Sequence, residues 1–517
     1  MAILGTLLKK GVTLRESLEQ MYTSPEDLQK QELRNLLILC QNTQFGDAYG
    51  FMEILSSLKK KNPDYYNVFR KNIPIFDYDK IYKKWWHLAI EGKKDICWPG
   101  KVKYFALSSG TSGSPSKHIP ITRDMLKAIR KTSIRQMLTM GKYGLSASLF
   151  SKGILMLGGS TDLKKSGHYF EGDLSGITTS QIPFWFQHFY KPGKKIAKTR
   201  DWNDKLGEIV KKAPDWDIGI IAGVPSWLQI LIEKIIDKYQ LNTIHDIWPN
   251  LQIFVHGGVS FEPYKRGFER LLSKPLIYME TYLASEGFIA FQAEPGSKSM
   301  RLVLNNGIFY EFIPFTEENF DDDGRLIGET ETLKVDQVEE NIDYALLITT
   351  NAGAWRYIIG DVIRFTSLDD CQIIITGRTK FFMSLCGEHL SLDNMNKAVE
   401  LVEEELKIDI REFTLLGGRS DSLFAHNWYI GTDDEVDEEM LKIKIDHHLK
   451  ELNDDYKVER ASALKEVRLT VLPTSMFYLW MEEQGRVGSQ NKFPRVLKKE
   501  KAQLWEAFLD RQNISVN

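Results

Sequence analysis

The sequence has little cysteine and no long apolar run, and each shortage excludes a class of protein. Its four cysteines lie far apart among 517 residues and include no Cys-x-x-Cys pair, which argues against a cysteine-bound zinc ion and fits a reducing compartment. The apolar stretch 218–236 is interrupted by Pro225 and Lys234, so it lacks the roughly 20 apolar residues of a membrane span. Only a brief apolar run precedes Lys9 and Lys10, unlike a signal peptide. We therefore expect a cytoplasmic protein.

The chain also lacks an excess of charge of either sign. It has 67 Lys+Arg against 70 Asp+Glu, a formal net charge of -3. Such a balance gives no general attraction for nucleic acid or an anionic membrane, so we expect neither as a partner. Hydrophobic residues make up 43% of the chain and aromatic residues 11%, enough for a large core and a ligand cleft. We expect a folded protein that is a monomer or a weak dimer.

The order of predicted elements indicates an α/β fold with two unequal domains. Helices dominate the first hundred residues, and strands then alternate with helices to about residue 300, which is typical of α/β layering. Thr122 is expected to cap a helix that runs to about residue 140. Between 300 and 380 strand pairs dominate, and we expect 301–303 to pair with 309–314.

After about residue 380 the pattern becomes that of a small α+β unit. We therefore predict a large N-terminal domain, residues 1–380, with mixed sheets layered with helices and a β-rich subdomain. A small, mobile α+β C-terminal domain, residues 381–517, follows it. At about 150 residues per domain, a chain of this length would hold two to four domains, so length alone does not set this boundary.

A loop rich in serine and glycine joins two predicted strands, 103–107 and 118–122. Its glycines let backbone N–H groups turn toward an anion, its hydroxyls donate hydrogen bonds, and its terminal lysine adds positive charge. The composition suits phosphate, although serine and glycine also enrich ordinary surface loops. No Gly-Lys-Ser/Thr ends the loop, so it is not a Walker A loop. The candidate phosphate ligands are Ser108, Ser109, Gly110, Thr111, Ser112 and Lys117.

This loop, Ser-Ser-Gly-Thr-Ser followed by Lys-x-Ile-Pro-x-Thr, resembles the phosphate loop of the adenylate-forming superfamily. That superfamily includes acyl-CoA synthetases, peptide-synthetase adenylation domains and luciferases. The loop is most similar to that of the auxin-responsive (Gretchen Hagen) family of acyl acid amido synthetases. The resemblance covers most of the chain, and it implies ATP and Mg²⁺ as cofactors.

A tyrosine four residues before a glutamate, in Tyr282-Leu283-Ala284-Ser285-Glu286, matches the next motif of the family. The resemblance implies that the tyrosine stacks on adenine, the serine approaches the phosphates and the glutamate is a catalytic residue that helps to hold Mg²⁺. The residue types suit these roles, because an aromatic face buries a base and Mg²⁺ prefers carboxylate and phosphate oxygens. A glycine-rich turn whose backbone lies along adenine in the family corresponds here to Gly257, Gly258 and Val259.

Two further segments complete the implied nucleotide site. Arg356-Tyr357-Ile358-Ile359-Gly360-Asp361 is similar to the Tyr-Arg-x-x-Gly-Asp segment of the family, in which the aspartate binds both ribose hydroxyls. Gly377-Arg378 resembles the segment that precedes the interdomain hinge, where Lys380 stands in place of the usual aspartate. The resemblance therefore implies that Tyr357, Asp361 and Arg378 contact adenine or ribose.

The C-terminal segment that ends in Lys492-Phe493-Pro494-Arg495 resembles the Tyr-Lys-x-Pro-Arg segment of the amido synthetases. A lysine on a mobile domain could reach the carboxylate and the α-phosphate and neutralise the charge that develops as they react. By itself, the segment could equally be a solvated basic tail. The resemblance implies that Lys492 is catalytic.

Taken together, these motifs predict a ligase that adenylates a small carboxylic acid with Mg-ATP and transfers the acyl group to an amine, such as that of an amino acid. An acyl-adenylate former that passes its acyl group to a thiol such as CoA, or to an alcohol, stays open. So does a nucleotide-binding protein without turnover. The residues of the acid pocket and the identity of the acid do not follow from the sequence.

Overall fold

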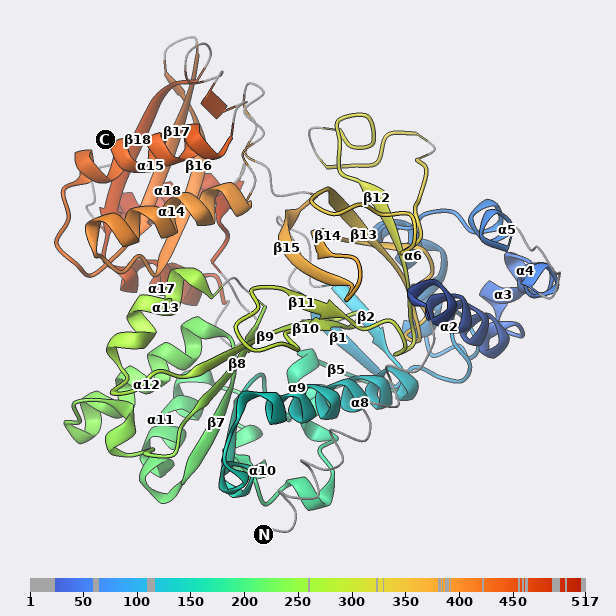
Figure 1. Cartoon of the computed structure of the whole chain (residues 1–517), viewed down its shortest axis with the longest axis horizontal. Helices are drawn as coiled ribbons and strands as arrows, with labels where there is room; N and C mark the ends of the chain where they lie inside the picture. The colour runs from blue at the N-terminus through green and yellow to red at the C-terminus, as the bar shows by residue number, and fades with distance from the viewer. Residues whose placement is uncertain are drawn as a thin grey trace.

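The computed structural model describes most of the chain (Figure 1). The described residues are 24–58, 65–108, 117–258, 261–321, 324–328, 330–379, 383, 385, 390, 392–420, 423–453, 456–457, 460, 464–485, 493–497 and 500–512.

One large sheet of 11 strands runs through the N-terminal part. Its strands, in spatial order, are β12 (Ile308–Pro314), β13 (Asp343–Thr350), β14 (Tyr357–Ser367), β15 (Gln372–Arg378), β11 (Met300–Leu302), β10 (Gly287–Phe291), β9 (Ile277–Ala284), β8 (Ile253–Gly257), β7 (Ile218–Gly223), β3 (Gly153–Leu157) and β6 (Tyr190–Lys191). Neighbours from β12 to β9 are antiparallel, whereas those from β9 to β6 are parallel. The sheet thus joins an antiparallel half to a parallel half at β9.

Helices cover this sheet and a smaller one beside it. The smaller sheet is β2 (Lys117–Ile121), β1 (Tyr104–Ser108), β5 (Tyr169–Gly172) and β4 (Lys164–Ser166). The helices before residue 100 are α2 (Pro25–Cys40), α3 (Gln44–Ala48), α4 (Phe51–Leu58), α5 (Tyr65–Asn72), α6 (Tyr78–Ile81) and α7 (His87–Ile90). Those that follow are α8 (Arg123–Thr139), α9 (Leu174–Ser180), α10 (Lys194–Ala197), α11 (Trp202–Lys212), α12 (Pro225–Tyr239) and α13 (Glu262–Arg270).

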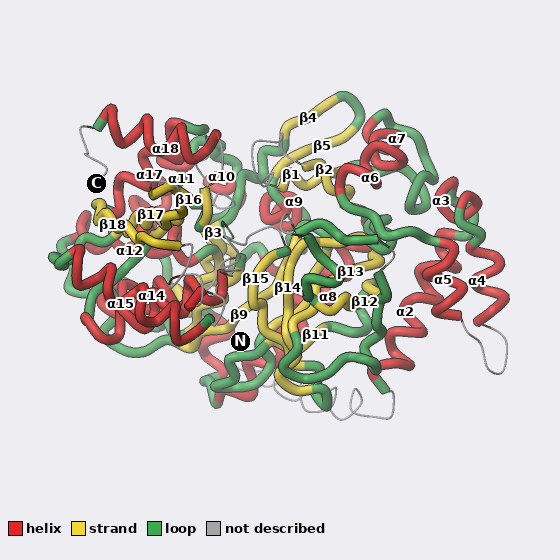
Figure 2. The backbone as a smooth tube through the Cα atoms, turned by 90° about the horizontal axis from the view of Figure 1, so that it is seen from above, coloured by secondary structure: helices red, strands yellow, loops and turns green. Residues whose placement is uncertain are grey.

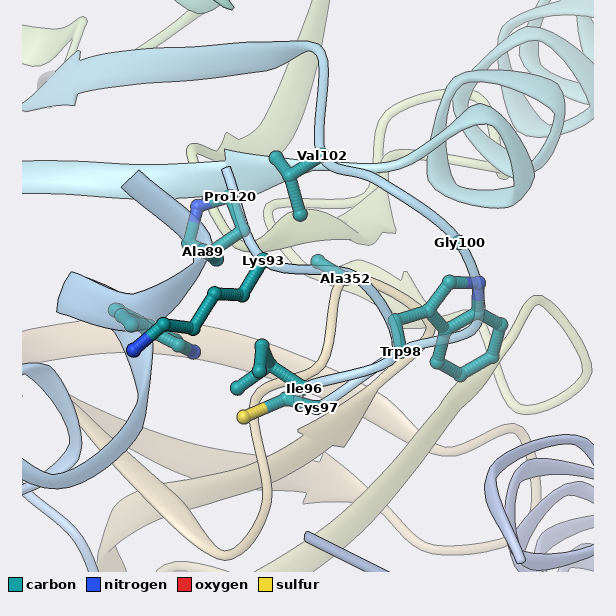
Figure 3. A pocket seen from close by; sticks show the side chains of 10 residues that line it. Ala89, Lys93, Ile96, Cys97, Trp98, Gly100, Val102, Pro120 and Ala352 are labelled. Atoms are coloured by element: carbon teal, nitrogen blue, oxygen red, sulfur yellow. The ribbon is translucent and has the colours of Figure 1, made fainter. Parts of the chain in front are cut away.

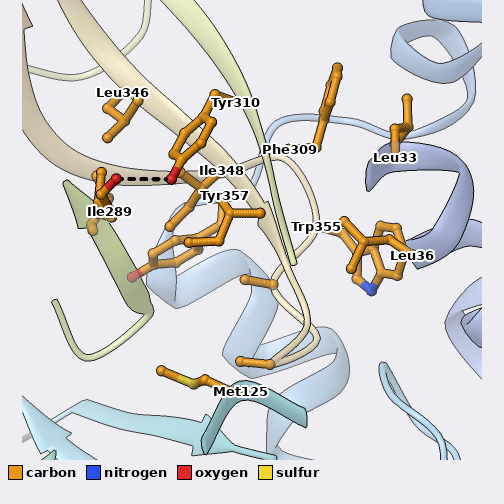
Figure 4. Packing of buried hydrophobic residues seen from close by; sticks show 14 of the residues in the cluster. Leu33, Leu36, Met125, Ile289, Phe309, Tyr310, Leu346, Ile348, Trp355 and Tyr357 are labelled. Atoms are coloured by element: carbon orange, nitrogen blue, oxygen red, sulfur yellow. Dashed lines mark hydrogen bonds between the residues drawn. The ribbon is translucent and has the colours of Figure 1, made fainter. Parts of the chain in front are cut away.

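Local sequence explains several helix starts. Ser24 precedes Pro25, and its side chain accepts a hydrogen bond from the backbone N–H of Asp27, so it caps α2. Thr122 caps α8 in the same way through the N–H of Met125, as the sequence predicts. The apolar face of α2 packs on the antiparallel half of the sheet, where Figure 4 shows Leu33 and Leu36 on the same side as Trp355. A second core lies between α11, α12, α13 and the parallel strands.

The C-terminal part has its own sheet, flanked by helices (Figure 2). Strands β18 (Leu464–Leu472), β17 (Leu423–Gly431), β16 (Glu412–Ser420) and β19 (Val496–Leu497) form the sheet. Helices α14 (Leu392–Leu406) and α15 (Glu438–Leu452) share one core with it, and α17 (Thr474–Glu483) and α18 (Glu500–Arg511) share another. The predicted α/β class, with a large N-terminal part and a smaller α+β C-terminal part, is confirmed.

One predicted pairing is wrong. The segment 301–303 does not pair with 309–314: β11 lies between β10 and β15, and β12 pairs with β13 at the edge of the sheet. The β-rich segment is therefore continuous with the α/β sheet. Short β11 lies inside the antiparallel half and joins β10 to β15, so β14 and β15 belong to the same sheet as β9 and the parallel strands.

Candidate nucleotide site

Glu286 lies in the two-residue turn between β9 and β10, where the two strands meet at the pair Ala284 and Gly287. A side chain at Gly287 would come within 2.7 Å of Ile308, so glycine allows β12 to pack closely against the turn. The Glu286 side chain is buried, with 8% of the residue exposed. This burial, together with the nearby negative charge of Asp361, raises the pKa of Glu286 to about 7.

Asp361 on β14 is the centre of a partly exposed hydrogen-bonded group, in which 14% of its own side chain and 38% of that of Arg378 are exposed. Its Oδ1 lies 2.9 Å from Nε of Arg378, the residue opposite it on β15. Its Oδ2 accepts a hydrogen bond from the hydroxyl of Tyr282 on β9. These two contacts use one lone pair on each carboxylate oxygen, so both oxygens can still accept another hydrogen bond. The charge of Asp361 in turn raises the pKa of Arg378, which keeps this guanidinium positive.

The backbone before Asp361 has a shape that glycine favours. Gly360 has φ +89°, in the left-handed region, and its carbonyl accepts a hydrogen bond of 2.8 Å from the N–H of Thr379. The register between β14 and β15 then shifts after Val362. Asp361 and Arg378 are directly opposite each other just before this shift.

Tyr357 and Lys117 complete the group of charged and aromatic side chains. Tyr357 is almost fully buried, and its ring centre lies 5.5 Å from that of Trp86. Burial raises the pKa of the Tyr357 hydroxyl well above its ordinary value, and the nearby charge of Glu286 adds to the effect. Lys117, at the start of β2, is close enough to Glu286 for its positive charge to lower the pKa of that carboxyl, and its Nζ lies 5.4 Å from the centre of the Tyr78 ring.

The glycine-rich turn after β8 packs directly against β9. A side chain at Gly257 would come within 2.3 Å of the carbonyl oxygen of Thr281, which precedes Tyr282. Gly258 has φ +86°, a conformation that favours glycine. The turn therefore needs both glycines, and it brings bare backbone to the strand that carries Tyr282.

The structure thus brings together most of the predicted site residues whose side chains it describes. A single group contains Lys117, Tyr282, Glu286, Tyr357, Asp361 and Arg378. Ser285 lies beside Glu286 in the turn, and the backbone of Ser108 ends β1. The predicted residues that lie outside the described part of the chain are Ser109, Gly110, Thr111, Ser112, Val259 and Lys492.

The group suits a cation that is also bound by phosphates. Glu286 is a buried carboxylate whose charge is disfavoured by its surroundings, so a metal ion there would relieve the cost of ionising it. No group of three or more His, Cys, Asp or Glu residues that could hold a metal ion occurs in the described residues. Mg²⁺ is commonly bound by one or two carboxylates together with nucleotide phosphates, which is the arrangement that these residues permit.

Sequence reasoning missed a buried lysine on the same edge of the sheet. Lys205 lies on the apolar face of α11 between Trp202 and Leu206, and only 3% of it is exposed. Its Nζ donates a 3.1 Å hydrogen bond to the carbonyl of Gly158, directly after β3. Burial lowers its pKa to about 8, and the charge of Asp173 opposes that shift. The signal in the sequence was a lysine at an otherwise apolar position of an amphipathic helix.

A small hollow lies beside Trp86, whose ring packs near that of Tyr357 (Figure 3). Its volume, including the open mouth, is about 250 Å³. Trp86, Ala89, Lys93, Ile96, Cys97, Trp98, Gly100, Val102, Pro120 and Ala352 line it. Burial raises the pKa of the Cys97 thiol well above its ordinary value, so the thiol stays protonated. With one lysine and mostly apolar walls, the hollow does not suit a polyphosphate.

A mixed sheet with glycine-rich turns at the carboxyl edge of its parallel strands, followed by a small α+β part, also occurs in solved structures. Two solved structures share it. The first, GH3.15 acyl acid amido synthetase, has a TM-score of 0.75 at 16% identity, over 96% of each chain. The second, a 2-hydroxyisobutyryl-CoA ligase, has a TM-score of 0.60 at 12% identity, over 94% of this chain and 92% of the other.

The family follows from the domain matches. The GH3 family N-terminal domain matches residues 14–207, the central domain 301–378 and the C-terminal domain 393–501. Together these matches cover more than half of the chain, which belongs to the GH3 family.

Similar curated proteins are plant enzymes. An indole-3-acetic acid-amido synthetase of Arabidopsis thaliana, GH3.17, is 24% identical over 74% of this chain and 73% of its own length. A second one, GH3.2, is 28% identical, but the matched region spans only 30% of each protein. No helix among the described residues is long and apolar enough to cross a membrane.

Proposed function

We propose that the protein is an ATP-dependent acyl acid amido synthetase. It activates a carboxylic acid as an acyl-adenylate, with release of pyrophosphate, and transfers the acyl group to an amine such as that of an amino acid, with release of AMP. The observation that carries the proposal is the convergence of Glu286, Asp361 and Arg378 from three separate segments at one edge of the sheet. Membership of the GH3 family supports the same chemistry.

Each residue of the group has a role that its surroundings support. Asp361 has lone pairs left for two ribose hydroxyls, and Arg378 holds its carboxylate in place. The Tyr282 ring and the backbone of Gly257 and Gly258 would flank adenine. In this proposal the Tyr282 hydroxyl also orients Asp361, which is a further role for the tyrosine.

The phosphates would lie between the serine-rich loop that follows Ser108 and the turn that carries Ser285 and Glu286. Glu286 and the nucleotide would hold Mg²⁺, which would neutralise phosphate charge when bound. Lys117 supplies fixed positive charge on the same side. Lys492 would stabilise the charge that develops as the acid carboxylate attacks the α-phosphorus.

The test is the partial reaction of the full chain. A panel of carboxylic acids should reveal at least one that supports exchange of pyrophosphate into ATP. Lys492→Ala should abolish this exchange while ATP still binds, whereas Lys498→Ala, in the same basic segment, should leave it within about twofold. Full exchange activity of Lys492→Ala would refute the role of that lysine.

A second measurement on the same enzyme identifies the molecule that accepts the acyl group. With the active acid, AMP release should depend on an added amino acid and not on CoA. Release that depends on CoA would instead establish a thiol acceptor. ATP binding with no exchange across the whole acid panel would indicate a nucleotide-binding protein without turnover.

A further inference from the structure

The segment Phe493–Arg495 is fixed to the sheet of the C-terminal part by its backbone. The hydroxyl of Thr414 donates a 2.8 Å hydrogen bond to the carbonyl of Pro494. The N–H of Leu415 donates a 2.9 Å bond to the carbonyl of Arg495, and β19 then continues beside β16. Because Lys492 directly precedes this segment, one end of the chain that carries the lysine is held against β16.

The Arg495 side chain reaches out of this sheet to the N-terminal part. Its Nη1 lies 2.6 Å from Oε2 of Glu412 on β16, and its Nη2 donates a 3.2 Å hydrogen bond to the hydroxyl of Tyr264 on α13. The Tyr264 hydroxyl donates in turn to Oε1 of Glu412, at 3.3 Å. The guanidinium also lies 4.4 Å from the centre of the Phe413 ring.

These three side chains form one buried polar triad across the junction of the two parts. Tyr264 and Glu412 are each 3% exposed, and the Arg495 side chain is 12% exposed. A buried guanidinium is tolerated when charged and polar partners satisfy it, and it becomes costly when one of them is withdrawn. The triad is therefore favourable only while α13 is docked on the C-terminal sheet.

Other contacts surround the triad and define the same docked arrangement (Figure 1). Arg266 of α13 donates a 2.9 Å hydrogen bond to the carbonyl of Ile408, and Arg270 pairs with Asp434 at 3.2 Å. On α12, Glu233 pairs with Arg411 at 2.9 Å. These contacts join the two parts, but none of them involves the segment that follows Lys492.

We propose that Arg495 is a positioning residue for Lys492, one that clamps the segment behind the lysine to both Glu412 and Tyr264 and so couples the lysine to domain docking. This proposal rests on the proposed function. The clamp fixes the backbone of Phe493–Arg495, and a group anchored next to a fixed segment loses less freedom in the transition state. Undocking of α13 removes Tyr264 and leaves Arg495 with partners of the C-terminal part such as Glu412 and Phe413, so the segment has a different set of partners in each arrangement.

The first experiment measures docking without any substrate. Backbone hydrogen exchange of the full chain is compared for wild type, Tyr264→Phe and Arg495→Lys. Both variants should speed exchange at least tenfold in α13 and at Leu415, whose N–H is bonded to the carbonyl of Arg495. The matched control is Arg460→Lys, because Arg460 forms a buried ion pair with Asp446, at 2.7 Å, wholly within the C-terminal part. The Arg460→Lys variant should leave the rate of hydrogen exchange in α13 unchanged.

The second experiment separates positioning from loss of stability. Pyrophosphate exchange and amine-dependent AMP release are measured for the same variants. Arg495→Lys should lower kcat of one half-reaction at least tenfold more than that of the other, with KM for ATP within about threefold of wild type. Tyr264→Phe should affect the same half-reaction in the same direction, whereas Arg460→Lys should affect both equally.

The possible results of the two experiments test the clamp and the proposed function separately. Unchanged exchange in α13 for both variants overturns the proposal, whatever the activity. An equal loss in both half-reactions, matched by the Arg460 control, also overturns it. A third outcome is that wild type activates no acid and yet the triad variants speed exchange in α13. In that case the proposed function is wrong and the coupling of the clamp to catalysis by Lys492 is refuted, whereas the role of the triad in docking is confirmed.

Discussion

Replacing Glu286 with glutamine should make the protein more stable at alkaline pH while it abolishes adenylation. Burial raises the pKa of this carboxyl from 4.5 to about 7, so the fold disfavours the charged form. The penalty is absent below pH 4.5 and is complete above pH 7, because only then is the group ionised in both the folded and the unfolded state. At about 1.4 kcal/mol per pKa unit, it amounts to about 3 kcal/mol at pH 8 and about 1 kcal/mol at pH 5. Glutamine has nearly the same shape and carries no charge, so it removes the penalty.

The assay is urea-induced unfolding of the full chain at pH 5 and pH 8, with pyrophosphate exchange measured in parallel. The gain in the free energy of unfolding of Glu286→Gln over wild type should grow by about 2 kcal/mol between the two pH values. The control is Glu294→Gln, because Glu294 is partly exposed and pairs with Lys142 at 2.7 Å; that variant should show no comparable gain. A Glu286→Gln protein that is less stable than wild type at pH 8, or a gain independent of pH, would refute the reasoning.

Two further predictions concern the buried framework of the site. Arg356→Ala leaves the fully buried Glu311 without its 2.9 Å ion pair, so we expect the free energy of unfolding to fall by about 3–5 kcal/mol, and the double variant Arg356→Ala/Glu311→Gln to recover part of the loss in the same urea titration. Gly257→Ala forces a methyl group to within 2.3 Å of the carbonyl of Thr281, so the dissociation constant for ATP, measured by calorimetry, should rise at least tenfold. Gly207→Ala, which has nothing within 4 Å, should not change it.

Local signals predicted the elements well, because they depend on residues close in sequence. Thr122 marked the start of α8 because a hydroxyl at that place can accept from the N–H three residues later. The pairing of strands is a different matter, since a period of two residues identifies a strand but not its neighbour. The expected pairing of 301–303 with 309–314 was wrong for this reason: β11 pairs instead with β15, about 70 residues further on.

In the candidate site, too, local motifs were predictable from the sequence, whereas contacts between distant segments were not. The motif residues were found by type and order, but the sequence could not show that the Tyr282 hydroxyl and the Arg378 guanidinium both bind Asp361. Lys205 was not predicted, because a lysine on an apolar helix face belongs to no sequence motif. Likewise, nothing near Arg495 in the sequence points to Tyr264, which is 231 residues away.

The candidate site draws on both the parallel and the antiparallel part of one sheet, and the short strand β11 lies between the strands that contribute to it. The parallel strands supply their carboxyl edge, where turns such as Gly257-Gly258 bring bare backbone to a ligand. The antiparallel strands supply Asp361 and Arg378 as a cross-strand pair. Within the antiparallel half, only the three residues of β11 join β10 on one side to β15 on the other. Because few backbone hydrogen bonds join β10 to β15 through β11, the contacts among Tyr282, Asp361 and Arg378 stabilise this join as well as shape the site. A substitution at Asp361 will therefore loosen the sheet as well as disable the site.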